Sequence, residues 1–369
     1  MTDLQQQVQE LLDELVSSGA ERGLQVAVYQ GGEQVVDAVA GLADAATGRP
    51  VTAGTPFYTY SVVKCATSTL VHMLVERGLF GYDTRIAELW PEFAANGKER
   101  ATVRHALTHS VGVPAVPAGT TPEDLCDWPK MCQVIADSTP WWEPGTRTGY
   151  HAYTFGYIAG EVIRRATGKP ISQVLLEEIA TPLGVADELY FGMPASQIGR
   201  VARQEDVAGS AEMMASMPDD APMFKAGPRA VWPTAELGNR ADILMAAIPG
   251  GGKNTARAMA RMLAALLGEV DGVRLLTPER LREASAVAIE GIDQIFGFPT
   301  KWALRYSVDV PGDPSASGHA IGLGGVGGSY AYADLRTGTA VALGKNRLSA
   351  DFSVAERLAG IVAKGVTEG

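Results

Sequence analysis

Cysteines and positive charges are both scarce in this sequence of 369 residues. The three cysteines, Cys65, Cys126 and Cys132, are an odd number without the C-x-x-C spacing of zinc sites and redox motifs. We therefore expect reduced thiols and no disulfide framework. Lys and Arg number 31 against 42 Asp and Glu, a net charge of −11, which argues against a general nucleic-acid binder.

Long apolar runs are also missing. No stretch of 18 apolar residues occurs, so no transmembrane span is expected. The first residues, Met-Thr-Asp-Leu-Gln-Gln-Gln, lack the basic and apolar regions of a secretory signal. Together with the reduced thiols, these features predict a cytoplasmic protein.

Metal and cofactor motifs are absent as well. The histidines form no H-E-x-x-H motif and no other metal-ligand spacing; they are His72, His105, His109, His151 and His319. Neither the G-x-x-x-x-G-K-[ST] phosphate loop nor the G-x-S-x-G motif of α/β-hydrolases occurs. We therefore expect neither a metal nor an organic cofactor.

Hydrophobic residues make up 46% of the chain, which is enough for a sizeable core. Apolar residues at helical or alternating spacing predict the main elements. Two strands, 24–29 and 33–40, are joined by a Gly31-Gly32 turn that is typical of a hairpin. Further strands are predicted over 302–308, 329–333 and 339–343, and helices over 4–16, 62–77, 156–166, 172–179, 256–267 and 354–364.

Because strands lie at both chain ends and helices in the middle, we predict an α+β fold. An antiparallel sheet built from both ends and flanked by helices would carry an inserted, mainly helical domain. The predicted boundaries are 1–80 with 250–369 for the α/β domain and 81–249 for the helical one. Within the latter, 205–240 is rich in Met and Pro with little periodicity, which predicts a long ordered loop or lid.

The most informative stretch is Phe57-Tyr-Thr-Tyr-Ser-Val-Val-Lys64. A serine and a lysine three residues apart lie on one face where they open a helix. Lys64, partly desolvated, would have a lowered pKa and could take the proton of the Ser61 hydroxyl. Alone, S-x-x-K is a weak signal, because an isolated match is usually a helix-start serine and a surface lysine.

A series of segments in a fixed order makes the signal specific. Phe57 precedes Ser61 by four residues, and the further segments are 74–83, Thr102-Val-Arg-His-Ala-Leu-Thr-His-Ser-Val-Gly-Val-Pro114, Trp142-Glu-Pro-Gly145, Gly149-Tyr150, Gly160-Glu161 and Thr167-Gly-Lys169. Over most of its length the sequence resembles the serine β-lactamase and penicillin-binding-protein superfamily. It resembles the family VIII carboxylesterases of that superfamily most closely.

The resemblance implies a site. Tyr150 stands where the superfamily has its second motif, and there it would share a proton network with Lys64; as a phenolate it could take the serine proton and then give it to the leaving group. Ala152 replaces the Asn that β-lactamases usually keep at the third position of that motif. The glycine-rich run 322–328 corresponds to the superfamily's K-T-G or H-x-G strand, and Leu323 occupies the position where Lys or His is usual. The backbone N–H groups of Ser61 and Val326 are the implied oxyanion hole.

Several other residues are candidates for binding substrate. Gly324 and Gly325 would let the strand pass close to the substrate, and Leu323 would line the pocket without a cation to pair with a carboxylate. His151 follows Tyr150, and Trp232 lies in the Met-rich segment, so we predict both at the acyl site. Packing in the core is the alternative for each.

The sequence thus predicts a serine hydrolase that forms an acyl-serine from a small-molecule ester or amide, most simply a carboxylesterase. Alternatives remain open: an acyltransferase that passes the acyl group to an amine or alcohol, a β-lactamase or D-amino-acid peptidase, and a non-catalytic binding protein. The acceptor, the substrate and the oligomeric state are not determined by the sequence.

Overall fold

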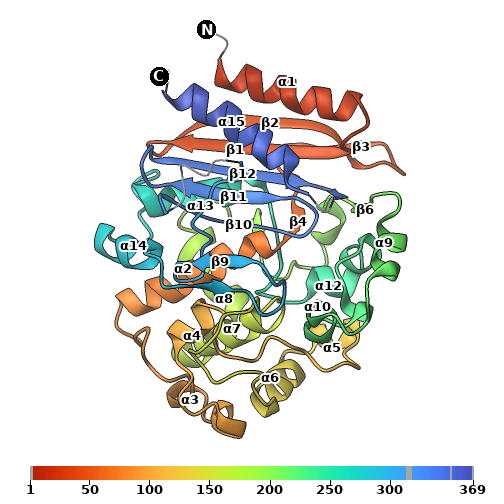
Figure 1. Cartoon of the computed structure of the whole chain (residues 1–369). Helices are drawn as coiled ribbons and strands as arrows, with labels where there is room; N and C mark the ends of the chain where they lie inside the picture. The colour runs from red at the N-terminus through yellow and green to blue at the C-terminus, as the bar shows by residue number, and fades with distance from the viewer. Residues whose placement is uncertain (1–2, 313–317, 350, 368–369) are drawn as a thin grey trace.

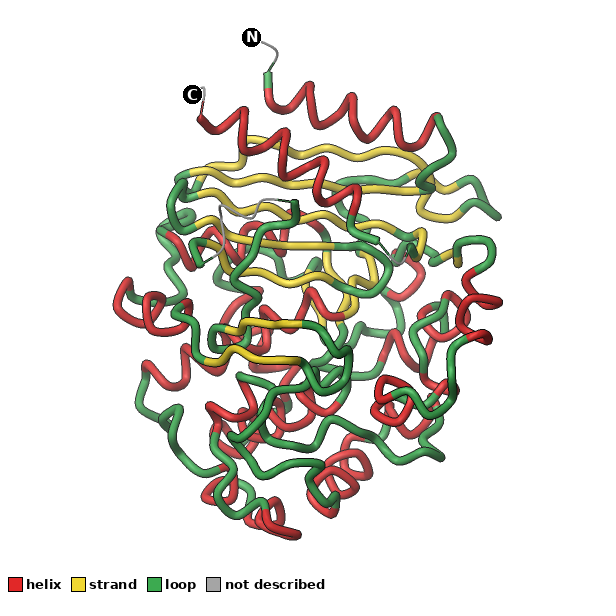
Figure 2. The backbone as a smooth tube through the Cα atoms, in the orientation of Figure 1, coloured by secondary structure: helices red, strands yellow, loops and turns green. Residues whose placement is uncertain are grey.

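The computed structural model describes residues 3–312, 318–349 and 351–367. A six-stranded antiparallel sheet is its main feature, in the order β10-β11-β12-β1-β2-β3 (Figures 1 and 2). The first three of these strands come from the C-terminal part of the chain and the last three from the N-terminal part. The prediction of an antiparallel sheet built from both ends is confirmed. The strands are β1 (Gly23–Gln30), β2 (Glu33–Asp44), β3 (Arg49–Pro50), β10 (Ala320–Gly324), β11 (Tyr330–Asp334) and β12 (Thr339–Lys345).

The predicted hairpin at the centre of this sheet forms as expected. Strands β1 and β2 pair antiparallel and are joined by Gly31 and Gly32, both of which have positive φ (+59° and +90°). Two consecutive positive φ values characterise the turn whose twist matches that of the strands, and glycine adopts them without strain. Strand β1 is buried along nearly its whole length because it is covered on both faces.

Helices cover both faces of the large sheet. On the outer face, α1 (Leu4–Ser17) and α15 (Ser353–Thr367) lie side by side (Figure 1). Leu11, Leu12 and Leu358 are among the residues through which they share one apolar cluster with the strands. On the inner face, α13 (Ala256–Leu267) packs on β1, β11 and β12. The two terminal helices and α13 agree with the predicted positions.

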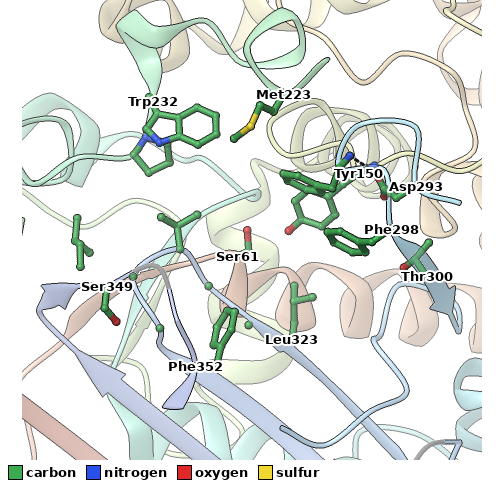
Figure 3. A pocket seen from close by; sticks show the side chains of 18 of the residues that line it. Ser61, Tyr150, Met223, Trp232, Asp293, Phe298, Thr300, Leu323, Ser349 and Phe352 are labelled. Atoms are coloured by element: carbon green, nitrogen blue, oxygen red, sulfur yellow. Dashed lines mark hydrogen bonds between the residues drawn. The ribbon is translucent and has the colours of Figure 1, made fainter. Parts of the chain in front are cut away.

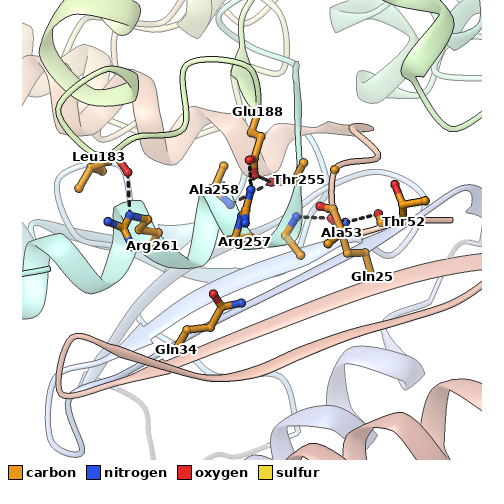
Figure 4. Close-up of polar contacts among 12 residues, drawn as sticks. Gln25, Gln34, Thr52, Ala53, Leu183, Glu188, Thr255, Arg257, Ala258 and Arg261 are labelled. Atoms are coloured by element: carbon orange, nitrogen blue, oxygen red, sulfur yellow. Dashed lines mark hydrogen bonds and ion pairs between the residues drawn. The ribbon is translucent and has the colours of Figure 1, made fainter. Parts of the chain in front are cut away.

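Polar contacts fix α13 at its N-terminal end (Figure 4). Thr255 caps the helix by accepting from the Ala258 N–H at 3.0 Å, and its hydroxyl donates to Glu188 at 2.7 Å. Arg257 forms an ion pair with the same carboxylate. The side chain of Gln25, in β1, accepts from the first N–H of the helix and donates to carbonyls of the 52–53 loop. The helix is therefore tied both to the sheet and to the helical part of the chain.

Below the large sheet, as seen in Figure 1, lie most of the remaining helices. Two of them, α2 (Lys64–Glu76) and α7 (Thr154–Thr167), pack on each other and are buried over most of their length. Around them stand α3 (Ile86–Leu89), α4 (Val103–Leu107), α5 (Pro122–Cys126), α6 (Trp128–Asp137), α8 (Ile171–Leu175), α12 (Ala241–Met245) and α14 (Pro278–Ser285). One apolar core runs from the inner face of the sheet into these helices. The division at residues 80 and 250 stays a prediction.

Three small sheets complete the strands. Strands β4 (Phe57–Tyr60), β7 (Gly252–Asn254) and β5 (Leu189–Tyr190) form one, and β6 (Glu205–Asp206) pairs with β13 (Arg347–Leu348). The hairpin of β8 (Ile289–Ile292) and β9 (Pro299–Trp302) stands apart from the large sheet in Figure 2. The short β8 strand is mostly exposed and was not predicted.

Two sequence predictions need correction here. Of the strand predicted over 302–308, only Trp302 lies in a strand, as the last residue of β9. The chain turns at 303–306, where Arg305 has a positive φ of +74°. The segment 205–240 is ordered, as expected, but short helices interrupt the loop. It contains α9 (Ser210–Ser216), α10 (Pro222–Ala226) and α11 (Ala235–Gly238), which are too short to show a clear period in the sequence.

Within the described residues, no helix combines the length and the apolar character needed to cross a membrane.

We expect the contact between α1 and the outer face of the sheet to contribute strongly to stability. Leu12 is fully buried there. Leu12→Ala should lower the free energy of unfolding by about 2–5 kcal/mol, as for other buried leucines that leave a cavity. Urea unfolding followed by circular dichroism measures it. Leu79→Ala, at a leucine that is 42% exposed, is the matched control, and an equal effect of both changes would contradict a tightly packed α1.

Candidate active site

The predicted nucleophile, Ser61, stands at the junction of a strand and a helix. It follows β4 and opens a single 3₁₀ turn, Ser61–Val63, that leads directly into α2. The preceding residue, Tyr60, has φ +50° and ψ −120°, a conformation that L residues rarely adopt. Its hydroxyl donates to Gln204 at 2.7 Å and its ring stacks on Tyr58 at 4.2 Å. These contacts hold the strained turn that presents the serine.

Lys64 lies one turn further along, as the spacing predicts. Its ammonium donates to the Ser61 hydroxyl oxygen at 2.7 Å and to the Gly250 carbonyl at 2.6 Å. The side chain is 1% exposed, and burial lowers the pKa of Lys64 to about 8. A fraction of the lysine is therefore neutral near pH 7, which a general base requires.

Tyr150 approaches the same serine from the loop before α7. Its backbone N–H donates to the carboxylate of Asp293 at 2.9 Å, and the Lys64 nitrogen lies 5.3 Å from its ring centroid. In Figure 3 the hydroxyl groups of Tyr150 and Ser61 point toward each other. Burial raises the pKa of Tyr150, but the positive charges of Lys64 and Arg305 outweigh it, so the pKa is lowered from its usual range.

The glycine-rich run forms the end of β10 and the turn after it. Gly328 donates to the Gly325 carbonyl at 3.1 Å, and Gly325 donates to Ser329 at 2.8 Å. Val326 is then the second residue of a tight turn, whose N–H takes no part in closing the turn. A Cβ on Gly325 would lie 2.0 Å from the Thr59 carbonyl oxygen, so only glycine lets this turn approach the strand that leads to Ser61.

A pocket of about 1800 Å³ opens over Ser61 and Tyr150. The predicted residues Leu323, Gly324, Gly325, Val326 and Trp232 all line it. Its other walls are mostly apolar and come from the Met-rich segment, the β8–β9 hairpin and the end of the chain; they include Met213, Met214, Met217, Met223, Phe296, Phe298 and Phe352. The lining therefore combines one polar centre with a wide apolar surface.

His151 does not belong to this lining. It is 1% exposed, its Nε2 accepts from the Val113 N–H at 3.1 Å, and its Nδ1 lies 2.6 Å from the Gly149 carbonyl oxygen. Both ring nitrogens therefore hold the backbone around Tyr150, and the predicted substrate contact is not present. Tyr150 faces the pocket, whereas the side chain of its neighbour His151 points into the core.

Sequence reasoning missed several residues of the site. Gly250, whose carbonyl accepts from Lys64, was not among the predicted site residues. Asp293, which positions the Tyr150 backbone, and Arg305, which lies behind the Tyr150 ring, are far from any motif. Gly250 begins a run of three glycines, 250–252, which is a weak local signal, but no local pattern marks the other two residues. In the described ranges, no group of three or more His, Cys, Asp or Glu residues could hold a metal ion.

A comparison with known proteins decides the family. The family model described as Beta-lactamase matches residues 8–364. The chain belongs to the β-lactamase family. Esterase/beta-lactamase LipL of Mycobacterium tuberculosis is 34% identical over 335 residues, which cover 88% of this chain and 76% of LipL. The resemblance that the sequence showed is confirmed, and the protein is a serine hydrolase of this family.

Solved structures of the β-lactamase family agree with the fold. A family VIII carboxylesterase superposes with a TM-score of 0.89 at 31% identity, covering 99% of this chain and 98% of that one. A penicillin-binding protein homolog from Caulobacter crescentus gives a TM-score of 0.88 at 30% identity, with the same coverage. The fold class predicted from the sequence is therefore confirmed over nearly the whole chain.

We expect Gly325 to set the distance between the turn and Ser61. Gly325→Ala forces the Cβ against the Thr59 carbonyl, and a displacement of about 1 Å at a reacting centre costs about 100-fold. Labelling of the protein by a fluorophosphonate, followed by intact mass, should slow by that factor. In Gly324→Ala the new Cβ meets the Phe352 and Tyr330 side chains, which can move, so the loss should be smaller. Equal rates in both variants would contradict the close approach.

Proposed function

We propose that the protein is a carboxylesterase that hydrolyses neutral, largely apolar esters through an acyl-serine at Ser61. The observation that carries the proposal is the arrangement of Ser61, Lys64 and Tyr150 at the base of an apolar pocket. A serine hydroxyl is a weak nucleophile until a neighbouring base takes its proton. Both neighbours here have pKa values shifted toward the range in which they can do so.

In the first step, the Ser61 oxygen attacks the ester carbonyl carbon. The serine proton moves to the Lys64–Tyr150 pair, and the carbonyl π electrons move onto the oxygen. The N–H groups of Ser61 and Val326 would hydrogen-bond this oxyanion. Collapse of the tetrahedral intermediate breaks the bond to the leaving alcohol, and the pair returns the proton to that oxygen.

In the second step, water takes the place of the alcohol. It attacks the acyl-serine carbonyl, gives a proton to the same pair, and the acid is released as Ser61 regains its proton. The pair titrates as a unit, because Lys64 and Tyr150 influence each other's pKa. No metal or organic cofactor takes part in either step of this proposal.

The charges around the pocket favour an uncharged substrate. Of the described residues, the cations that line it are Arg229 and Lys301. Arg229 is engaged with Asp219 at 2.8 Å and with two carbonyls of the Met-rich segment, and Lys301 lies 3.6 Å from Glu290. Carboxyl groups outnumber these cations in the lining: Asp206, Asp219, Glu290, Asp293 and Asp309. Among the described lining residues, a substrate carboxylate would therefore meet no cation that lacks an acidic partner, which disfavours β-lactams and peptide C-termini.

The apolar walls favour a bulky substrate. Trp232, Phe296 and Phe298 line the pocket, and the two phenylalanine rings stack with their centroids 5.7 Å apart. Methionine side chains from the 205–240 segment add an adaptable surface. If this segment acts as a lid that excludes water, an amine or alcohol could replace water as acceptor, and acyl transfer is the second candidate function.

We expect Ser61 to become acylated. Intact mass after mixing with p-nitrophenyl butyrate should show a single butyryl adduct on the wild type and none on Ser61→Ala. An adduct that decays in buffer supports the esterase, whereas decay only after addition of an amine supports acyl transfer. Ser68→Ala is the matched control and should still be acylated, because Ser68 is a buried serine one turn after Lys64 in α2 whose hydroxyl donates to the Lys64 carbonyl. Turnover by Ser61→Ala would contradict the proposal.

We expect Leu323 to govern the charge preference. Leu323→Lys should raise kcat/KM for p-nitrophenyl hemisuccinate, which carries a carboxylate, relative to the neutral butyrate. One charge-assisted hydrogen bond corresponds to a change of about tenfold or more. Leu323→Met controls for a change of side chain without a charge. An unchanged ratio in the lysine variant would mean that residue 323 does not meet the acyl group.

A further inference from the structure

Arg305 is unusual among the buried residues. It is fully buried, and its Nε and both terminal nitrogens have no hydrogen-bond partner among the residues that the structure describes. Nor does any described carboxylate lie within ion-pair distance of it, in contrast to the buried pair of Lys345 and Glu21. An unpaired buried cation is costly, so such a residue needs a reason.

The backbone at Arg305 is strained as well. Its φ of +74° lies in the region that favours glycine. The turn is closed by Ala303, which donates to the Tyr306 carbonyl at 3.0 Å, and by Arg305, which donates to the Ala303 carbonyl at 2.7 Å. Glycine would fit this turn with less strain than arginine. The side chain therefore adds something that the turn itself does not require.

Three aromatic rings surround the guanidinium. Its central carbon lies 4.6 Å from the ring centroid of Phe155, 5.2 Å from that of Trp302 and 5.4 Å from that of Tyr150. Arg305 does not line the pocket, whereas Tyr150 and Trp302 do. The guanidinium thus lies behind Tyr150, out of reach of substrate, and its effect on the reaction must pass through that ring.

The Tyr150 ring is flanked by two cations. Lys64 lies 5.3 Å from its centroid and Arg305 5.4 Å. An arginine keeps its proton in any protein environment, whereas a lysine can lose it. The carboxylate of Asp293 contacts the Tyr150 backbone: it accepts the N–H groups of Tyr150, Ile295 and Phe296, and among the described residues it forms no ion pair with Lys64 or Arg305.

Four further titratable groups lie near Tyr150 or Arg305, and burial favours the neutral form of each. Burial lowers the pKa of His109, whose ring centroid lies 4.7 Å from that of Tyr150, and lowers the pKa of His151 to about 4. Burial raises the pKa of Cys65 to about 12 and raises the pKa of Tyr306. The hydroxyl of Tyr150 is therefore the group in this cluster best placed to carry a negative charge.

We propose that Arg305 is a positioning residue that keeps Tyr150 ready as a phenolate, so that the tyrosine oxygen takes the Ser61 proton. As the Ser61 oxygen bonds the ester carbon, its proton moves to the phenolate; the phenol then gives the proton to the leaving alkoxide and becomes a phenolate again. Lys64 holds the serine oxygen throughout. The proposal rests on the esterase mechanism above and adds Arg305 as the residue that keeps the charge on Tyr150. The lowered pKa of Tyr150 agrees with it.

The test measures tyrosinate directly. Absorbance at 295 nm is titrated without substrate in the wild type and in Tyr150→Phe, and the difference isolates residue 150. We expect Tyr150 to ionise with a midpoint below about pH 10, which is the usual value for tyrosine. In Arg305→Met this midpoint should rise by at least about one pH unit. The acid limb of kcat/KM should move by the same amount. A wild-type midpoint at or above 10, or an unmoved midpoint in a folded Arg305→Met, overturns the proposal.

Further variants separate charge from structure. Arg305→Lys keeps a cation, so the titration midpoint of Tyr150 should stay close to that of the wild type. Arg305→Gly suits the positive φ but removes the charge, so its midpoint should rise as in Arg305→Met. A glycine variant with wild-type titration would overturn the proposal even if the methionine variant does not fold. Arg280→Met is the matched control, because Arg280 also lies 5.4 Å from a tyrosine ring, that of Tyr82, outside the pocket. It should leave the pH profile unchanged.

The failure of this proposal and that of the esterase proposal are distinguishable. The absorbance titration needs no turnover, so it reports on Arg305 and Tyr150 even if no ester is hydrolysed. Conversely, a butyryl adduct on Ser61 together with a Tyr150 midpoint at or above pH 10 would support the esterase proposal and contradict the one on Arg305. Neutral Lys64 would then be the base.

Discussion

The burial of Lys64 beside the Ser61 hydroxyl is the constraint on which the rest of the site depends. An ammonium group that is 1% exposed must find hydrogen-bond acceptors inside the protein. It finds the serine oxygen and the Gly250 carbonyl, and the two bonds fix the serine relative to the loop before β7. The same burial lowers the pKa of Lys64, so the contact that orders the site also prepares its chemistry.

Several parts of the fold serve this one contact. The strained Tyr60 ends β4 so that Ser61 faces the pocket, and Gln204 holds the Tyr60 hydroxyl from outside. Gly325 lets the end of β10 lie against Thr59, which brings the Val326 turn beside the serine. Gly156 allows α7 to pass so close to Gly250 that a Cβ would lie 2.2 Å from its nitrogen. Glycines are required at these places because backbones meet there.

The distribution of charge distinguishes the base of the site from its walls. Cations gather beneath Tyr150, where no substrate reaches them, while the cations that line the pocket are engaged with acids. Leu323 lines the pocket where the resemblance places a Lys or His in related proteins. Positive charge is thus used to adjust the catalytic groups and not to bind substrate, which fits the neutral ester that we propose.

The sequence by itself determined the local parts: the hairpin at Gly31-Gly32, the terminal helices, and the Ser61–Lys64 spacing that places both groups on one face of a helix start. These follow from backbone conformation and periodicity over a few residues. It could not reveal Asp293 or Arg305, nor that His151 points into the core. Those placements depend on chain segments that are distant in sequence and meet only when the core packs. Only the tertiary structure decided that a buried arginine lies behind Tyr150, because burial and mutual distance, not residue type, set its effect on charge.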